Sequence, residues 1–288
     1  MHLRMIHSGR TRDSLVTPSD ARTFDLMLQL RLQLVRCEPT SQFNVLGTRC
    51  NGNGILHDEP YGHFHLVAWR PDEWTAFRTN IVPIIMRYWD RKFELTPSRP
   101  WYQPRNGGAA VAARFTCSLS LQLVEAAGHA HQRYYIVKPQ ETSFRSFANG
   151  EAQRAMFTHR DLSSERSMVR TRVGTARHRI SFLQSTVLHE FGHTLGLHHV
   201  AGTGDNDAAY GTTLQQRQDI MGWGDHAAGT AARPWVSQLR HHLIRAHGEA
   251  PLTFTPRVVN PQLITYWDSD WVPPAAAAHG DGHGHAAP

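Results

Sequence analysis

Lysine is almost missing from this chain, and this shortage bears on its partners. Lysine and arginine together number 30, but Lys92 and Lys138 are the only lysines. The arginines are scattered rather than clustered, and the formal net charge is +6. Such a distribution favours a solvated, mildly basic surface over a stripe that binds nucleic acid. We therefore expect no nucleic acid among the partners.

Long apolar runs are missing as well. No run approaches the roughly 20 residues that span a bilayer. The segment from Met1 to Asp13 has no apolar core of the kind that a secretory signal contains. We expect no membrane span, and either a cytoplasmic location or export by a non-classical or secretion-system route. With 40% hydrophobic and 19% charged residues among 288, a folded chain with a sizeable core is expected.

Cysteine is scarce, whereas histidine is abundant. Cys37, Cys50 and Cys117 allow at most one internal disulfide, and Cys37 and Cys50 are the closer pair in sequence. No CxxC pattern occurs, which argues against thiolate zinc sites and thioredoxin-like redox chemistry. The chain has 20 histidines, each a potential metal ligand or a proton carrier near neutral pH.

Hydrophobic periodicity predicts strands, then a helix, then further strands in the first 180 residues. A helix should begin at Pro71, and Pro83 should kink or split it. Stretches rich in glycine and proline predict loops at 42–61 and 96–108. Alternation of apolar and polar residues predicts strands at Phe24–Leu34 and Phe115–Leu123, with weaker candidates at His63–Trp69, Tyr134–Lys138 and Gln153–Thr158.

The segment HEFGHTLGLHH, residues 189–199, carries the clearest chemical signal. A capping-box pattern at Ser181 and Gln184 predicts that a helix starts shortly before it. On that helix His189 and His193 lie one turn apart on the same side, where two imidazoles can bind one zinc ion. Glu190 is offset around the helix, so it can miss the metal yet reach a water beside it, as a general base must.

Gly196 and the histidines after it complete this pattern. Glycine accepts the left-handed backbone that ends a helix, so the chain can turn back at Gly196 and bring His199 to the same metal. His198 is an alternative third ligand, but His199 has the more suitable offset. Three neutral nitrogen donors leave one position open for water, which is typical of a catalytic zinc site.

These residues resemble the signature of the metzincin clan of zinc metalloproteases, HExxHxxGxxH. Metzincins also carry a methionine in a tight turn beneath the metal. The segment from Asp219 to Gly224 resembles that Met-turn, with Met221 as its methionine. Astacins and serralysins place a tyrosine two residues after this methionine, where it can join the metal. Trp223 occupies that position here, so the site is most similar to that of matrixins, with three histidines and water.

The resemblance implies an α+β fold, in which a twisted mixed sheet and a long helix precede the zinc helix and a further helix follows the Met-turn. Pro234, followed by Val236, Leu239 and Leu243 at helical spacing, fits the start of that last helix. We expect an N-terminal extension at 1–20 and a catalytic domain at 21–272, divided near residues 196 and 197. The Ala/Gly/His composition of 273–288 predicts a disordered tail.

The function implied by the resemblance is that of a zinc metalloendopeptidase acting on a protein or peptide substrate, with Glu190 as general base. Because metzincins mostly act outside their cell of origin, the resemblance also suggests a bacterial toxin or secretion-system effector. We expect a monomer. The substrate should pair with a sheet edge, for which Gln153–Thr158 is the candidate. Trp223, Asp225 and His226 are candidates for the cleft wall. Asp205, Asn206 and Asp207 could bind calcium, but their composition favours a solvated loop.

Two other classes of protein remain open at the level of sequence. The first is a non-catalytic zinc-binding module on the same scaffold, against which the presence of Glu190 argues. The second is a metal-storage or metal-delivery protein, suggested by the abundance of histidine and by His279, His283 and His285 in the tail.

Overall fold

The computed structural model describes residues 5–102, 108–173, 176–204, 206–247 and 252–259. The tail expected at 273–288 lies outside these residues. The strands are β1 Met5–Ser8, β2 Asp13–Pro18, β3 Thr23–Arg36, β4 Gln42–Val45, β5 Thr48–Asn51, β6 Ile55–Asp58, β7 Gly62–His65, β8 Phe93–Pro97, β9 Arg114–Leu123, β10 Gln132–Val137, β11 Phe147–Asn149, β12 Arg154–Thr158, β13 Ser164–Val173, β14 Ala176–Ser185 and β15 Phe254–Val258. The α-helices are α1 Pro71–Trp89, α2 Thr186–Thr194, α3 Leu214–Gln218 and α4 Arg233–His247.

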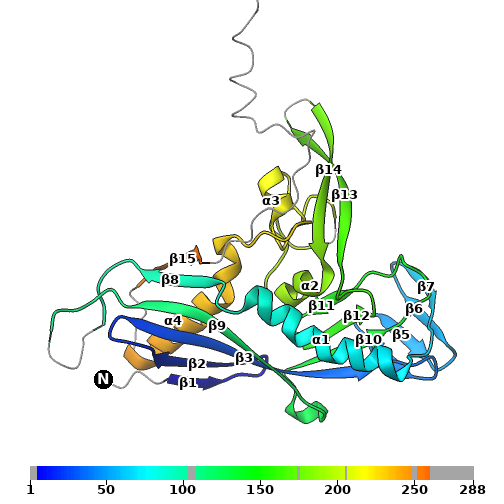
Figure 1. The fold of residues 1–288 in the computed structure, drawn as a ribbon, viewed down its shortest axis with the longest axis horizontal. Coiled ribbons are helices and arrows are strands. Elements are labelled where there is room, and N and C mark those ends of the chain that lie inside the picture. The colour runs from blue at the N-terminus through cyan, green and yellow to red at the C-terminus, as the bar shows by residue number, and fades with distance from the viewer. Residues whose placement is uncertain (1–4, 103–107, 174–175, 205, 248–251, 260–288) are drawn as a thin grey trace, which may run out of the picture.

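A twisted mixed sheet organises the fold, which is α+β as expected (Figure 1). Its strands follow the order β11-β12-β10-β3-β9-β8-β15, and β1 and β2 extend it beside β3. The neighbours β12, β10, β3 and β9 run parallel, whereas β11 is antiparallel to β12 and β8 is antiparallel to β9. The strands predicted at Phe24–Leu34 and Phe115–Leu123 are confirmed as β3 and β9.

Helices α1, α2 and α4 pack on one face of this sheet. Along β3 the even-numbered residues from Phe24 to Leu32 are fully buried, while their odd-numbered neighbours remain partly exposed. The buried side chains share one apolar cluster with residues of three helices, among them Ile85 of α1, Phe191 of α2 and Trp235 of α4. The alternation in the sequence therefore marks the face of β3 that the helices cover.

Helix α1 is continuous through Pro83, so of the two expected outcomes, a kink or a split, the split is wrong. It begins at Pro71 as predicted, and the Glu73 side chain accepts a hydrogen bond from the Arg70 amide at 3.0 Å. Proline removes one helical hydrogen bond, to the carbonyl four residues earlier. Both Pro83 and Thr79, which supplies that carbonyl, are exposed. Water can therefore satisfy the carbonyl, and the buried face of the helix is unaffected.

The region 42–61, expected to be a loop, instead forms most of a small antiparallel sheet, β4-β5-β6-β7. Its glycines occupy tight turns between short strands, which is why the composition suggested a loop. Val45, Leu56 and Phe64 of this small sheet pack against Tyr135 and Val137 of β10. The other side of β10, with Tyr134 and Ile136, belongs to the helix-covered core. Strand β10 is thus buried on both faces, which accounts for its unbroken apolar run.

All three cysteines are buried, and none forms a disulfide. Cys37 and Cys50 lie in the apolar cluster beneath the small sheet, and Cys117 lies in the main core. Burial raises the pKa of the Cys37 thiol to about 12. A thiol with such a pKa is protonated at neutral pH and contributes to packing rather than to chemistry.

Residues 5–8 and 13–18, which lie within the expected N-terminal extension, form strands that join the main sheet. Strand β2 pairs with β3 from Asp13 to Pro18, and β1 pairs with β2. In the turn between them, Arg12 donates a hydrogen bond of 2.8 Å from Nη1 to the Leu195 carbonyl. That carbonyl lies at the C-terminal end of α2, where a cation is favoured by the helix dipole.

Strands β13 and β14 form a long hairpin that projects from the sheet and leads directly into α2 (Figure 1). The helix therefore begins at Thr186, not near the capping-box pattern at Ser181 and Gln184, because both of those residues belong to β14. Helix α4 confirms the helix expected after the Met-turn. Within the described residues, none of the helices combines the length and the apolar character that a bilayer crossing requires.

We predict that Arg12→Met lowers the free energy of unfolding by about 1.5–3 kcal/mol, the range for a lost hydrogen bond to a charged group. Chemical denaturation measures this difference. The control is Arg10→Met, which removes an exposed guanidinium that also donates to a carbonyl, that of Glu151. It should change stability by less than about 0.5 kcal/mol. Equal stabilities for the two variants would contradict the role of Arg12.

Candidate metal centre

Helix α2 carries the first part of the histidine pattern on a deeply buried surface. Val187 and Phe191 are fully buried in the main core, and the indole of Trp89 donates to the Leu188 carbonyl at 3.3 Å. The packing of α2 against α1 orients the side that bears His189 and His193. Their ring centroids are 4.9 Å apart, as expected for residues one turn apart on a helix.

The chain reverses at Gly196, as the sequence predicts. Gly196 has a φ of +84°, and its amide donates to the His193 carbonyl at 2.9 Å. The Leu197 amide then donates to the Gly192 carbonyl at 3.0 Å, which closes the turn. This reversal brings His199 beside the helix. One ligand nitrogen from each of His189, His193 and His199 lies within 4.8 Å of the others, so the group could hold a metal ion.

Backbone carbonyls determine the tautomer of all three imidazoles. The Nδ1 atoms of His189, His193 and His199 lie 2.7, 2.8 and 2.7 Å from the carbonyl oxygens of Ile220, Leu197 and Gly204. A carbonyl oxygen only accepts, so each Nδ1 carries the proton and donates it. Each Nε2 of the neutral ring is then left with a lone pair, which is the state required of a metal ligand.

The distances between the nitrogens fit one shared ion. The Nε2 atoms of His193 and His199 are 3.1 Å apart. Two Zn–N bonds of about 2.0–2.1 Å at a tetrahedral angle would separate their nitrogens by about 3.3 Å. Burial and, secondarily, the neighbouring His193 hold the pKa of His189 well below its ordinary value. The neutral ring, which binds metals, is therefore favoured over the imidazolium.

Glu190 and His198 lie as the sequence predicts. Glu190 is buried and lines a cavity of about 440 Å³ together with His193 and His199. His198 is exposed and does not belong to the three-histidine group. The adjacent histidines thus differ in environment, because the turn at Gly196 directs only His199 toward α2.

Met221 lies against the underside of α2. A Cβ atom added to Gly192 would come within 2.3 Å of the Met221 sulfur, so only glycine at this helix position permits the contact. The segment from Asp219 to Gly224 forms a tight turn, in which the Gly222 amide donates to the Asp219 carbonyl at 2.8 Å. The Asp219 carboxylate also accepts from the Met221 amide at 2.8 Å. These bonds hold the Ile220 carbonyl where it can accept from His189.

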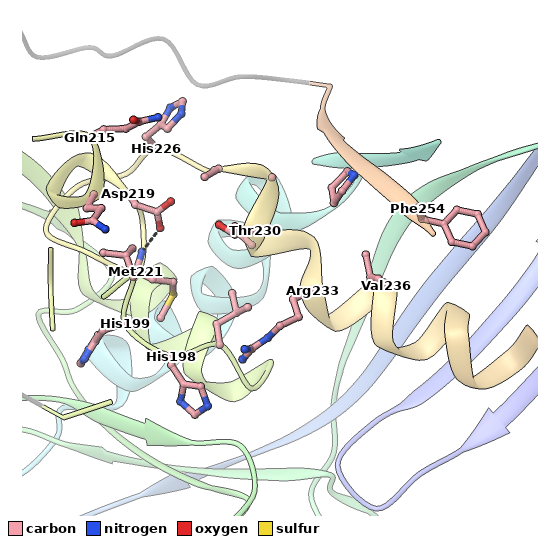
Figure 2. A pocket seen from close by; sticks show the side chains of 17 residues that line it. His198, His199, Gln215, Asp219, Met221, His226, Thr230, Arg233, Val236 and Phe254 are labelled. Carbon is pink, nitrogen blue, oxygen red and sulfur yellow. Dashed lines mark hydrogen bonds between the residues drawn. The ribbon is translucent and has the colours of Figure 1, made fainter. Parts of the chain in front are cut away.

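A second cavity, of about 620 Å³, opens on the Met221 side of His199 (Figure 2). His199 and Met221 line it on one side, and Val236 and Phe254 on the other. His226 lines it too, as expected of a cleft residue. Both cavities reach His198 and His199, so open space lies on two sides of the histidine group.

Trp223 and Asp225, the other expected cleft residues, line neither of these cavities. The Trp223 ring stacks on that of Tyr210 with centroids 4.5 Å apart. The Asp225 carbonyl accepts a hydrogen bond of 2.7 Å from the Tyr88 hydroxyl, and burial raises the pKa of the Asp225 carboxyl. Trp223 thus packs behind Tyr210, which lines the cavity with Glu190.

The sheet edge beside the centre is β11, not the segment Gln153–Thr158 predicted from the sequence. That segment forms β12, which pairs on one side with β10 and on the other with β11. Strand β11 is only three residues long and lacks an apolar alternation, so no sequence pattern marks it. Phe147, Ala148 and Asn149 of β11 line the same cavity as Glu190.

Tyr210 and Arg145 complete the centre, and the sequence offered no signal for either. The Tyr210 ring lies 4.0 Å from the His199 ring, centroid to centroid. Arg145 donates to the Tyr210 hydroxyl from Nη2 at 2.8 Å. Both residues line the cavity with Glu190. They come from loops separated by 65 residues, which carry no periodicity.

Of the three residues considered as calcium ligands, Asn206 and Asp207 form hydrogen bonds within the protein. Asp207 accepts two hydrogen bonds, of 3.0 and 2.8 Å, from the guanidinium of the buried Arg217, and the Asn206 side chain accepts from the Ala209 amide at 3.0 Å. Asp205 lies outside the described residues. The carboxylate of Asp207 thus already serves an ion pair that organises the loop.

We predict that His199→Ala abolishes stoichiometric metal binding, because it removes one of three converging nitrogen donors. Elemental analysis of the dialysed protein, with residues 275–288 deleted to remove the tail histidines, measures the metal content. The control is His198→Ala, which alters the adjacent exposed histidine and should leave one metal per chain. Full metal content in His199→Ala would contradict the assignment of the group.

The chain matches no protein-family model, no curated protein and no solved structure. The case for its function therefore depends on the geometry of the histidine group and the residues around it.

Proposed function

We propose that the protein is a zinc-dependent metalloendopeptidase of the metzincin type. One observation carries the proposal: three imidazoles, each held by a backbone carbonyl, bring their ligand nitrogens within 4.8 Å of one another, next to a cavity that the buried Glu190 also lines. Three histidine nitrogens with an open fourth position are typical of catalytic zinc rather than structural zinc. Met221 beneath α2 and the turn at Gly196 support the same assignment.

When bound, zinc supplies a Lewis acid that polarises a carbonyl group and lowers the pKa of water. The chain's own residues supply the proton transfers. Glu190 takes a proton from the attacking water and delivers it to the amine that leaves. Its place on the helix, between His189 and His193, makes it a lining residue of the cavity that His193 and His199 also line.

Strand β11 is suited to hold the substrate in an extended form. It is the edge of the main sheet, and it lines the cavity that contains Glu190. A peptide added to such an edge gains backbone hydrogen bonds without regard to sequence, and its side chains alternate between the two walls. This geometry favours a peptide substrate over a small molecule.

Tyr210 is suited to stabilise the negative charge that develops on the carbonyl oxygen of the cleaved bond. Its hydroxyl accepts a hydrogen bond from Arg145, and its ring lies against His199. A phenol that accepts from a guanidinium becomes a stronger donor. A preorganised donor of this kind acts mainly in the transition state.

We predict that Glu190→Gln retains zinc and thermal stability but lowers the rate of peptide hydrolysis by about 10²–10⁴-fold, the usual effect of a lost general base. Cleavage of a peptide library, followed by mass spectrometry, measures the rate. Glu151→Gln, which changes an exposed glutamate, serves as control. Zinc binding without any cleavage by the parent protein would instead favour a non-catalytic zinc module.

The predicted effect of Tyr210→Phe is a fall in kcat of roughly 10²–10³-fold with little change in KM, as for other lost oxyanion donors. Steady-state kinetics on the best library peptide separates the two constants. Tyr135→Phe, which alters a buried tyrosine beneath the small sheet, should change neither. An unaltered kcat in Tyr210→Phe would assign the hydroxyl a purely structural role.

A further inference from the structure

Two turns of the small sheet, one between β4 and β5 and one between β6 and β7, expose apolar side chains beside the histidine group. We call these turns the tips of the small sheet. Leu46 and Tyr61 are 52% and 43% exposed, and both line the cavity that contains Glu190 and His199. Pro60 lines it next to Tyr61. These tips face the same cavity as β11, so a peptide paired with β11 would pass beside them.

Leu46 occupies a position that disfavours leucine. Leu46 and Gly47 form the two-residue connection between β4 and β5, closed by the pair Val45 and Thr48. Their φ angles are +52° and +96°, and a turn with two positive φ values strongly favours Asn-Gly. A bulky residue with positive φ is an outlier that the fold alone does not require. The unfavourable leucine therefore points to a role for its exposed side chain.

Tyr61 is held in place by the residues of the metal centre. Arg145 donates from Nη1 to the Tyr61 hydroxyl and from Nη2 to the Tyr210 hydroxyl, each at 2.8 Å. Tyr210 in turn lies against His199. The tip that carries Tyr61 is thus connected to the histidine group through one guanidinium. This connection holds Tyr61 in a fixed position relative to His199.

Two acidic residues, Asp58 and Glu59, lie at these tips, and of the two only Asp58 lines the cavity. The exposed Glu59 has its carboxylate beside Gly47 instead. Asp58 is buried, accepts from the Thr48 hydroxyl at 2.5 Å, and accepts from the Tyr61 amide at 3.2 Å. Its carboxylate stabilises the turn that carries Tyr61, which leaves the surface formed by Leu46, Pro60 and Tyr61 apolar. Such a surface suits an apolar side chain better than a basic one.

We infer that Leu46 and Tyr61 form a specificity wall that selects a bulky apolar side chain of the substrate, near the bond to be cleaved. The inference rests on the proposed peptidase function and deepens it. It assigns the substrate class as peptides with an aromatic or large aliphatic residue at one fixed position relative to that bond.

The test is the library cleavage profile of the full chain compared with that of Leu46→Asn. Asparagine suits the positive φ, so this variant should melt no lower than the parent. We expect kcat/KM for the best apolar peptide to fall about tenfold or more, the effect of lost contacts in an apolar pocket. For the same peptide with alanine at the selected position, the change should be less than about twofold.

The matched control is Ile55→Thr, which alters another exposed apolar residue of the small sheet, 37% exposed and outside the cavity. It should leave the profile unchanged. A parent that cleaves peptides without apolar preference, or a preference that survives in Leu46→Asn, would overturn the wall and leave the peptidase function intact. A parent that binds zinc but cleaves no peptide would overturn both.

Discussion

The candidate centre depends on three backbone carbonyls that accept hydrogen bonds from imidazole Nδ1 atoms. Each carbonyl comes from a different element: Leu197 from the turn after α2, Gly204 from the following loop, and Ile220 from the turn that carries Met221. Together they determine which nitrogen of each ring holds a proton and where its lone pair points. The turns between α2 and α4 therefore fix the orientation of all three rings.

Such an arrangement brings three nitrogen lone pairs close together, and these repel one another unless a cation lies between them. The Nε2 atoms of His193 and His199 lie 3.1 Å apart, while the Nδ1 atom of each ring donates to a carbonyl oxygen. The packing of α2 between α1 and the Met221 turn, with the Met221 sulfur against Gly192, resists any separation of the rings. The fold thus holds a binding geometry that a metal ion would stabilise further.

The two-sided burial of β10 explains how distant segments meet at this centre. Helices cover one face of the strand, and the small sheet β4–β7 covers the other. The edge strand β11 lies one strand beyond β12, so α2 and the tips of the small sheet both reach the cavity that β11 lines. The side chains of Leu46, Asn149 and Glu190 surround one space although roughly 140 residues separate the first from the last.

The sequence by itself determined what depends on neighbours along the chain. The alternation in β3 and β9, the start of α1, the spacing of His189 and His193, and the reversal at Gly196 follow from local periodicity and backbone preference. Only the tertiary structure decided which strand is the sheet edge and that residues 42–61 form a small sheet. It also decided that Tyr210 and Arg145 lie beside the histidines. Those outcomes depend on which surfaces remain to be buried once the sheet has formed. A three-residue strand or a loop tyrosine acquires its position from long-range packing, which leaves no periodic trace in the sequence.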